Sequence, residues 1–186
     1  RLDGSLTVES GNDAPINVTD NSGADMGLML DFINSSGGSI NVTRIDAHPP
    51  ADSLTDFTDP SGTITDPEYA RRYYEINPTI SGTFAVDIGF DYNTLAGILD
   101  PAALRLAKRS LNAGTGEEWT LIPSASTTLN ETDGLVVATN QTAFSQWTIL
   151  SNEGENTFID MQAPTVSSTV VNPAQPGILE DVTVTA

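Results

Sequence analysis

Hydrophobic and polar residues alternate most cleanly over residues 83–90, TFAVDIGF. Phe84, Val86, Ile88 and Phe90 occupy one set of alternate positions, and smaller or polar residues occupy the other. A period of two residues is typical of a β-strand with one buried face. The pattern therefore predicts a strand at the centre of the hydrophobic core.

Shorter runs with a similar pattern predict further strands on both sides of this one. We expect them at residues 6–8, 16–18, 26–33, 39–47, 71–76, 104–106, 119–122, 135–139 and 144–150. The glycines and serines of residues 35–38 are expected to end the third of these strands. The last two runs are predicted to pair as a hairpin across residues 140–142.

Two segments interrupt the strand pattern. Residues 48–70 contain several prolines, which favour turns and extended chain, so we expect a long loop there. Asp100 is predicted to cap a single helical turn, because Asp accepts backbone N–H groups and Pro101 suits the first helical position. Residues 104–109 would suit a continued helix or a strand, and the alternation of their leucines favours the strand.

About ten predicted strands and no long helical pattern indicate an all-β fold. We expect an immunoglobulin-like or jelly-roll-type sandwich of two sheets with an extended C-terminal β tail. The 186 residues divide into a sandwich domain at 1–151, a linker at 152–162 and a tail at 163–186. Hydrophobic residues make up 38 % of the chain, which is enough for a packed core.

Acidic residues far outnumber basic ones, with 25 Asp plus Glu against 7 Lys plus Arg and a net charge of −18. Such a surface repels nucleic acid and anionic membranes, and it suits high salt or divalent cations. The absence of cysteine excludes disulfides and thiolate metal sites. No apolar run approaches the ~20 residues of a membrane-spanning helix. The chain begins at Arg1 without a methionine, so we expect a processed or excised piece of a longer precursor.

Five sequence blocks follow one another between residues 38 and 150: GSINVTRIDAHPP, RRYYEI, LRLAKRS, EWTLI and AFSQWTIL. Their order resembles a β-sandwich module of bacterial secreted and cell-surface multidomain proteins, with Tyr74 where that module usually has Trp. Residues 163–186 resemble the start of a bacterial immunoglobulin-like repeat. The resemblances imply a secreted or cell-surface location and an adhesive, stalk or filament role. They imply no catalytic residue.

Catalytic chemistry has few candidates in this sequence. His48 is the only histidine and lies in the proline-rich segment, where we expect a surface residue rather than a member of a Ser-His-Asp triad. A glycosidase would need two carboxylates in a cleft with sugar-stacking aromatic residues. Trp119 and Trp147 are the only tryptophans, and we expect both in the core. An exposed planar arrangement of Trp119, Trp147 or Tyr73 beside polar groups would support a carbohydrate-binding module, and burial of both tryptophans would count against it.

Carboxylates in the long loop form the best metal candidate, because oxygen ligands gathered in a loop suit Ca²⁺. The candidate ligands are Asp52, Asp56, Asp59, Asp66 and Glu68. Asp20, Asn21 and Asp25 form a second, smaller cluster. The alternative is an acidic surface that is simply solvated.

Five of the seven basic residues fall within one part of the chain: Arg71, Arg72, Arg105, Lys108 and Arg109. Neighbouring strands could gather them into a patch that docks an acidic face of another copy. The alternative is cross-strand ion pairing with nearby acids. Lys108 shares a face with apolar residues, so an isopeptide bond to an Asn is a further hypothesis.

The tail carries two apolar stripes, which consist of Val166 and Val170 and of Val182 and Val184. A piece of this length cannot form a core alone. It is therefore either part of a further immunoglobulin-like domain or a donor strand that completes a sheet of another subunit. A strand at residues 2–8 could serve the same purpose.

These observations favour a non-catalytic extracellular structural module: a surface stalk, adhesin or filament subunit. It would act through strand-edge and domain contacts with other copies of itself or with neighbouring immunoglobulin-like domains. The alternative is a carbohydrate-binding module of a secreted multidomain enzyme, with a polysaccharide as its partner.

Overall fold

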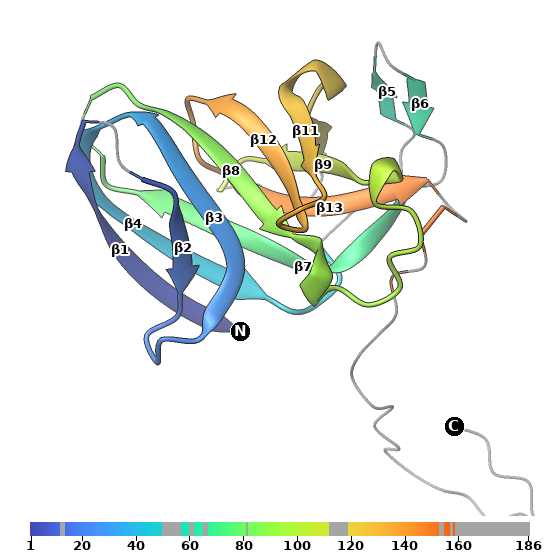
Figure 1. Ribbon diagram of the computed structural model, residues 1–186, viewed down its shortest axis with the longest axis horizontal. Coiled ribbons are helices and arrows are strands. Elements are labelled where there is room, and N and C mark those ends of the chain that lie inside the picture. The colour runs from blue at the N-terminus through green and yellow to red at the C-terminus, as the bar shows by residue number, and fades with distance from the viewer. Residues whose placement is uncertain are drawn as a thin grey trace, which may run out of the picture.

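The computed structural model describes residues 1–11, 14–49, 57–59, 62–64, 67–80, 82–111, 119–152, 155–156 and 158. Regular structure in them is almost entirely β, and two antiparallel sheets pack face to face (Figure 1). The expected all-β sandwich of two sheets is thereby confirmed.

One sheet has six strands in the order β1-β4-β7-β13-β9-β10. These strands are β1 (Leu2–Ser10), β4 (Ser36–Ile45), β7 (Pro67–Pro78), β13 (Gln146–Asn152), β9 (Arg105–Arg109) and β10 (Thr120–Leu121). All neighbours pair antiparallel. The strand β1, predicted as a possible donor to another chain, is paired along its length with β4 of its own sheet.

The other sheet has five strands in the order β11-β12-β8-β3-β2. These strands are β11 (Thr127–Asn130), β12 (Leu135–Gln141), β8 (Ala85–Asp91), β3 (Asp25–Asn34) and β2 (Ile16–Thr19). A small separate hairpin joins β5 (Phe57–Asp59) to β6 (Gly62–Ile64). Three 3-10 turns, η1 (Tyr92–Thr94), η2 (Pro101–Ala103) and η3 (Ser124–Ser126), complete the described elements.

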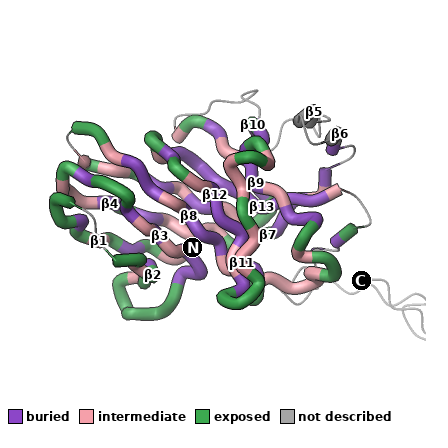
Figure 2. The backbone as a smooth tube through the Cα atoms, turned by 45° about the horizontal axis from the view of Figure 1, so that its top comes forward, coloured by how far each residue is buried: buried purple, intermediate pink, exposed green. Residues whose placement is uncertain are grey.

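The interior between the sheets is built around β8, as the alternating pattern predicts. Val86, Ile88 and Phe90 are each 0 % exposed and belong to the main core cluster. Trp147 of β13 and Tyr74 of β7 meet Phe90 from the opposite sheet, with ring centroids 5.8 and 5.5 Å away. Figure 2 shows the resulting concentration of buried residues along β8, β12 and β13.

A second apolar cluster lies on the outer face of the six-stranded sheet. It consists of Ile64, Tyr69, Ala107, Trp119, Leu121 and Leu150, with Tyr73 packed against it. Because β13 is covered on both faces, six of its seven residues are buried and its sequence does not alternate.

The predicted hairpin between residues 135–139 and 144–150 is wrong. β12 pairs with β11 and β8 in the five-stranded sheet, whereas β13 pairs with β7 and β9 in the six-stranded sheet. The ladder between β12 and β8 shifts register after Ala138, and Asn140 has a positive φ of 54°. Asn tolerates this conformation, so the chain turns there and crosses between the sheets instead of folding back.

Two predicted boundaries also change. β7 already begins at Pro67, and β5 and β6 lie inside the segment predicted as a loop at residues 48–70. At the other end, Asn156 is 0 % exposed and Phe158 belongs to the core. The sandwich therefore continues beyond residue 151 into the predicted linker at 152–162. The cap predicted at Asp100 is confirmed, because its side chain accepts the N–H of Ala102 and the chain then forms a single 3-10 turn.

Candidate functional site

The outer face of the five-stranded sheet carries an open groove with a volume of about 530 Å³. Gly27, Met29 and Leu135 contribute to its floor. Gly27 has a φ of +67°, and a side chain added there would meet Oγ1 of Thr94 at 3.1 Å and the hydroxyl of Tyr74 at 3.3 Å. The polar side chains that line the groove are Asn17, Asp25, Asp31, Asp91, Asn130 and Asp133. The groove thus combines an apolar floor with an acidic border.

Three of these carboxylates shape the backbone at the border of the groove. Oδ1 of Asp25 accepts the N–H of Gly27 at 2.8 Å, and Oδ1 of Asp91 accepts the N–H of Asn93 at 2.8 Å. Oδ2 of Asp133 accepts a hydrogen bond from Nδ2 of Asn130 at 2.8 Å. These are local turn contacts, in which short polar side chains bond to nearby groups of the chain.

The fourth carboxylate, Asp31, lies in β3 directly opposite Asp87 in β8. Directly opposed residues of an antiparallel pair lie on one face with their Cβ atoms roughly 4.5–5.5 Å apart, so like charges there are unfavourable. Asp87 also accepts the N–H of Asn140 at 2.7 Å, which fixes the turn after β12. This open face therefore carries two opposed carboxylates at its centre.

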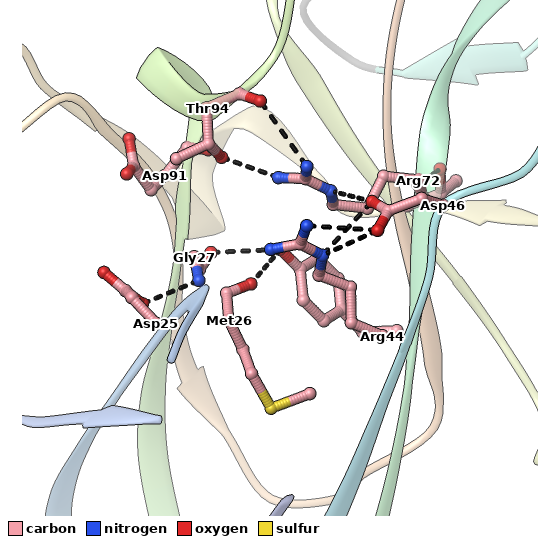
Figure 3. Close-up of polar contacts among 10 residues, drawn as sticks. Asp25, Met26, Gly27, Arg44, Asp46, Arg72, Asp91 and Thr94 are labelled. Carbon is pink, nitrogen blue, oxygen red and sulfur yellow. Dashed lines mark hydrogen bonds and ion pairs between the residues drawn. The ribbon is translucent and has the colours of Figure 1, made fainter. Parts of the chain in front are cut away.

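A network of charged groups borders the groove and joins the two sheets (Figure 3). Asp46 lies between two guanidinium groups, at 3.0 Å from Nη2 of Arg44 and 2.7 Å from Nε of Arg72. Arg72 also donates to Oγ1 of Thr94, in the turn that follows β8, at 2.6 Å. Partial burial alone would raise the pKa of Asp46, but the hydrogen bonds from both arginines outweigh it and hold the pKa below its ordinary value.

Tyr74 forms a second link between the sheets. Its hydroxyl donates to the carbonyl of Met26 at 2.8 Å and lies 3.1 Å from the carbonyl of Gly27, both in β3. Burial raises the pKa of Tyr74 to about 12, so the hydroxyl keeps its proton and remains a donor. The sequence placed Tyr74 only in a predicted strand, where the module that the chain resembles usually has Trp.

The basic residues predicted as a docking patch are divided among several places. Arg72 belongs to the network just described. Arg105 donates to the carbonyls of Ala102 and Leu104. Arg109 is 9 % exposed and donates from Nε to Oε1 of Gln146 at 2.6 Å. Arg71 lies exposed on β7.

Lys108 points between the sheets rather than to the surface. Its Nζ donates to Oε1 of Gln141 at 3.1 Å and lies 5.5 Å from the centroid of the Trp147 ring. Burial lowers the pKa of Lys108. In the described chain its polar contact is with a Gln rather than an Asn, so the hypothesis of an isopeptide bond to Asn finds no partner there.

Both tryptophans are buried, as expected. Trp147 is 0 % exposed, and Trp119 is 4 % exposed with the guanidinium carbon of Arg109 4.9 Å above its ring. Neither ring offers a flat exposed surface for sugar stacking. His48 is exposed, as expected for a surface residue, with its Nδ1 3.1 Å from the carbonyl of Pro49.

Most of the predicted Ca²⁺ ligands and all four tail valines lie outside the described residues. The side chains of Asp52, Asp56, Asp59 and Asp66 are not described, nor are Val166, Val170, Val182 and Val184. Glu68 is half-buried on β7 opposite Ser151. Within the described ranges, no group of three or more His, Cys, Asp or Glu side chains is arranged to hold a metal ion.

The smaller acidic cluster has a local structural role. Oδ1 of Asp20 accepts the N–H groups of Ser22 and Ala24 at 2.8 and 2.9 Å, which closes the turn between β2 and β3. The hydrogen bond from the Ser22 hydroxyl, with those backbone bonds, lowers the pKa of Asp20. Asp25 belongs to the groove instead, so the structure does not gather Asp20, Asn21 and Asp25 around one point.

Sequence reasoning missed the groove and the charged network. Asp31, Asp87 and Gly89 stand at the polar positions of alternating strands, which marked that face as solvent-exposed but not as hollow. Arg44 and Asp46 were assigned to the end of a strand, and nothing in their spacing pointed to Arg72 or Thr94. Among the described residues, no helix is long and apolar enough to cross a membrane. Comparisons with protein-family models, curated proteins and solved structures found no match.

Proposed function

We propose that this chain is a non-catalytic extracellular structural module, a subunit of a surface stalk, adhesin or filament. It acts through strand-edge and domain contacts with other copies of itself or with neighbouring immunoglobulin-like domains. The observation that carries the proposal is β1, a nine-residue edge strand in unbroken register with β4. Long regular edges invite pairing with another chain, and proteins usually blunt them.

The polar side chains support the same proposal. Arg72 and Tyr74 tie one sheet to the other through Thr94 and Met26, and Asp46 holds Arg72 in place. Such links strengthen a module that transmits force between its ends. The extracellular location is supported by the acidic, cysteine-free composition and by the resemblance to bacterial secreted and cell-surface modules.

The proposal is tested by measuring molar mass with light scattering while the concentration of the full chain is varied. We expect the mass to rise above that of one chain as concentration increases. Melting temperatures measured with Ca²⁺ and with EDTA test whether the acids of residues 52–68 bind Ca²⁺, since a cation bound to the folded state raises the melting temperature by mass action. A chain that stays monomeric at every concentration contradicts the structural role.

The groove on the five-stranded sheet favours one alternative, a carbohydrate-binding module of a secreted enzyme. Its Asp and Asn side chains offer hydrogen-bonding groups of the kind that recognise sugar hydroxyls. Both tryptophans are buried, so such binding would lack stacking. Retardation of the chain in gels that contain a polysaccharide, lost on Asp91→Asn and Asp133→Asn substitution, would support this alternative.

A further inference from the structure

The four sheet edges of the sandwich differ in length and regularity. β10 has two residues, and β2 and β11 have four each, so three edges are short. β1 has nine residues, and its pairing with β4 runs from Leu2 opposite Arg44 to Ser10 opposite Ser36 without a shift. It contains no proline and no bulge, which are two common means of protecting an edge. The turn after β2 covers the end of β1 at Asp3 and Gly4, so the middle of β1, around Ser5 and Thr7, is the stretch best suited to accept another strand.

The orientation of the free backbone groups on β1 follows from one hydrogen bond. The carbonyl of Asp3 accepts the N–H of Asn21 at 3.0 Å, so the backbone of Asp3 points away from β4. Backbone groups of alternate residues in a strand point to the same side. Those of Ser5 and Thr7 therefore also point away from β4, and β1 is the last strand of its sheet. An incoming strand would pair there.

The side chains of β1 leave an apolar strip incompletely covered. Val8 is buried, whereas Leu2 and Leu6 are only half-buried although they pack against the core. The charged residues of β1 stand near its ends, which leaves Gly4 to Val8 without charge. An added strand with small apolar side chains would cover the leucines and would meet no charge in the middle of the edge.

The chain itself contains a segment of this chemistry at residues 165–171, TVSSTVV. It is uncharged and rich in β-branched residues, and it places Val166 and Val170 on one face of an extended strand. An antiparallel pairing of β1 with β1 of another copy, centred on Leu6, would instead set Asp3 opposite Glu9 at both ends. Like charges directly opposite each other are unfavourable, so the uncharged segment fits better.

We propose that residues 165–171 of one copy add as a strand to the free edge of β1 in a neighbouring copy. This inference rests on the proposed function and specifies its contact. Repeated head to tail, such a heterologous contact generates a filament where the rotation between copies does not close a ring. Main-chain hydrogen bonds at Ser5 and Thr7 would supply affinity, and Val166 and Val170 would cover Leu6.

A neighbouring copy fits better than the same chain for reasons of reach. Asn152 lies opposite Pro67 of β7, and Pro78 at the other end of β7 lies opposite Ile40, which pairs with Leu6. Asn152 and Leu6 are therefore ~36 Å apart in the direction of the strands, and β1 lies ~14 Å from β13 across the sheet. Asn156 is held by the backbone of Leu99 and Asp100. The nine residues from there to Thr165 span at most ~31 Å, so the same chain could bring Thr165 to the level of Asp3 only with this stretch fully extended, which a neighbouring copy does not require.

The first experiment measures the molar mass of full-length variants by light scattering at matched concentrations. Val166→Asp with Val170→Asp is expected to abolish association, whereas Ser167→Asp with Thr169→Asp adds the same charge to the other face and should retain it. On the acceptor side, Thr7→Pro removes an outward N–H and should weaken association about ten-fold. Thr7→Ala keeps that N–H and should leave association within about two-fold of the original chain.

The second experiment leaves β1 unchanged, so its result tests the proposal even if the Thr7→Pro variant fails to fold. A labelled peptide of residues 163–172 is titrated into the chain that carries Val166→Asp and Val170→Asp. Two versions of the peptide are N-methylated, one at Val166, Ser168 and Val170 and the other at Ser167, Thr169 and Val171. Only alternate N–H groups of an added strand face the edge, so one version should lose binding and the other should keep it.

The outcomes separate this inference from the proposed function. If the peptide does not bind, or if both methylated versions bind equally, β1 is not the acceptor; oligomers of the full chain would then still support the structural role. If the unaltered chain is monomeric while the peptide binds only the Val166→Asp, Val170→Asp chain, the tail closes on its own β1 and the neighbour contact is wrong. A monomeric chain with no peptide binding overturns both proposals.

Discussion

The outer face of the six-stranded sheet is covered, whereas the outer face of the five-stranded sheet is open. On the covered face, Tyr69, Trp119 and Leu150 form a second apolar cluster, and each is less than 5 % exposed. On the open face, Met29 and Leu135 are only half-buried, and aspartates surround them. The six-stranded sheet therefore has a second apolar layer outside β7, β13 and β9, whereas the described residues form no such cluster outside the five-stranded sheet.

The difference shows which face serves stability and which is available for contacts. The cationic group on the covered face, Arg109, is buried over Trp119 and linked through Gln146 to Glu75. The acidic groups on the open face hold local turns or oppose each other, as Asp31 and Asp87 do. Substitutions should therefore cost folding free energy on the covered face and little on the open one.

The largest difference between the faces is expected for Trp119→Ala compared with Met29→Ala. Removing the buried indole leaves a cavity between Tyr69 and Arg109, and such truncations cost about 3–5 kcal/mol. Met29 is half-buried on the open face, so its truncation should cost less than about 1 kcal/mol. Urea denaturation of both variants measures the two free energies of unfolding. Equal losses would mean that the second cluster is not a core.

A smaller effect is expected for Arg109→Met, which keeps the volume of the side chain and removes its donors. Oε1 of the buried Gln146 then loses its partner, so the free energy of unfolding should fall by about 1–3 kcal/mol. Asp133→Asn on the exposed turn beside the groove is the matched polar change and should stay within about 0.5 kcal/mol. If Arg109→Met unfolds at the same urea concentration as the original chain, the link from Arg109 to Glu75 does not stabilise the covered face.

Whether the sequence predicts a strand and its partners depends on whether one face of that strand is exposed to solvent. β8 and β3 alternate because one face is bare, and both were predicted from Phe84 to Phe90 and from Met26 to Phe32. β13 is buried on both faces, so its strand was predicted but its partners were not. The chain crosses between the sheets at Asn140, a single residue with positive φ. In sequence, residues 140–142 look like an ordinary three-residue polar turn, so the crossing was not predicted. The Asp46 network joins residues 26 positions apart, a distance at which no local pattern reports contact.

Acid should weaken the hold of Asp46 on Arg72, the residue that links the sheets through Thr94. Hydrogen bonds from Arg44 and Arg72 keep the pKa of Asp46 below its ordinary value of 3.8, despite partial burial. Its contribution to stability is therefore present above the unfolded pKa and is lost as pH falls through the folded pKa. Since the side chain is 36 % exposed, Asp46→Asn should cost only about 1 kcal/mol or less at neutral pH. Melting temperatures between neutral pH and about pH 2.5 should converge for the two chains; parallel curves would show that Asp46 is not the titrating group.

The smallest effect, and one of opposite sign, is expected for Asp31→Asn on the open face. Asp31 lies directly opposite Asp87, and removing one of two opposed like charges should stabilise the fold by about 0.2–1 kcal/mol. The gain should shrink in high salt, because salt screens exposed charges. Melting temperatures of Asp31→Asn and Asp46→Asn, measured together at low and high salt, compare the expected gain in stability at Asp31 with the expected loss at Asp46. A loss of stability at Asp31 would mean that its carboxylate has a partner on this face, and the open sheet would then be built like the covered one.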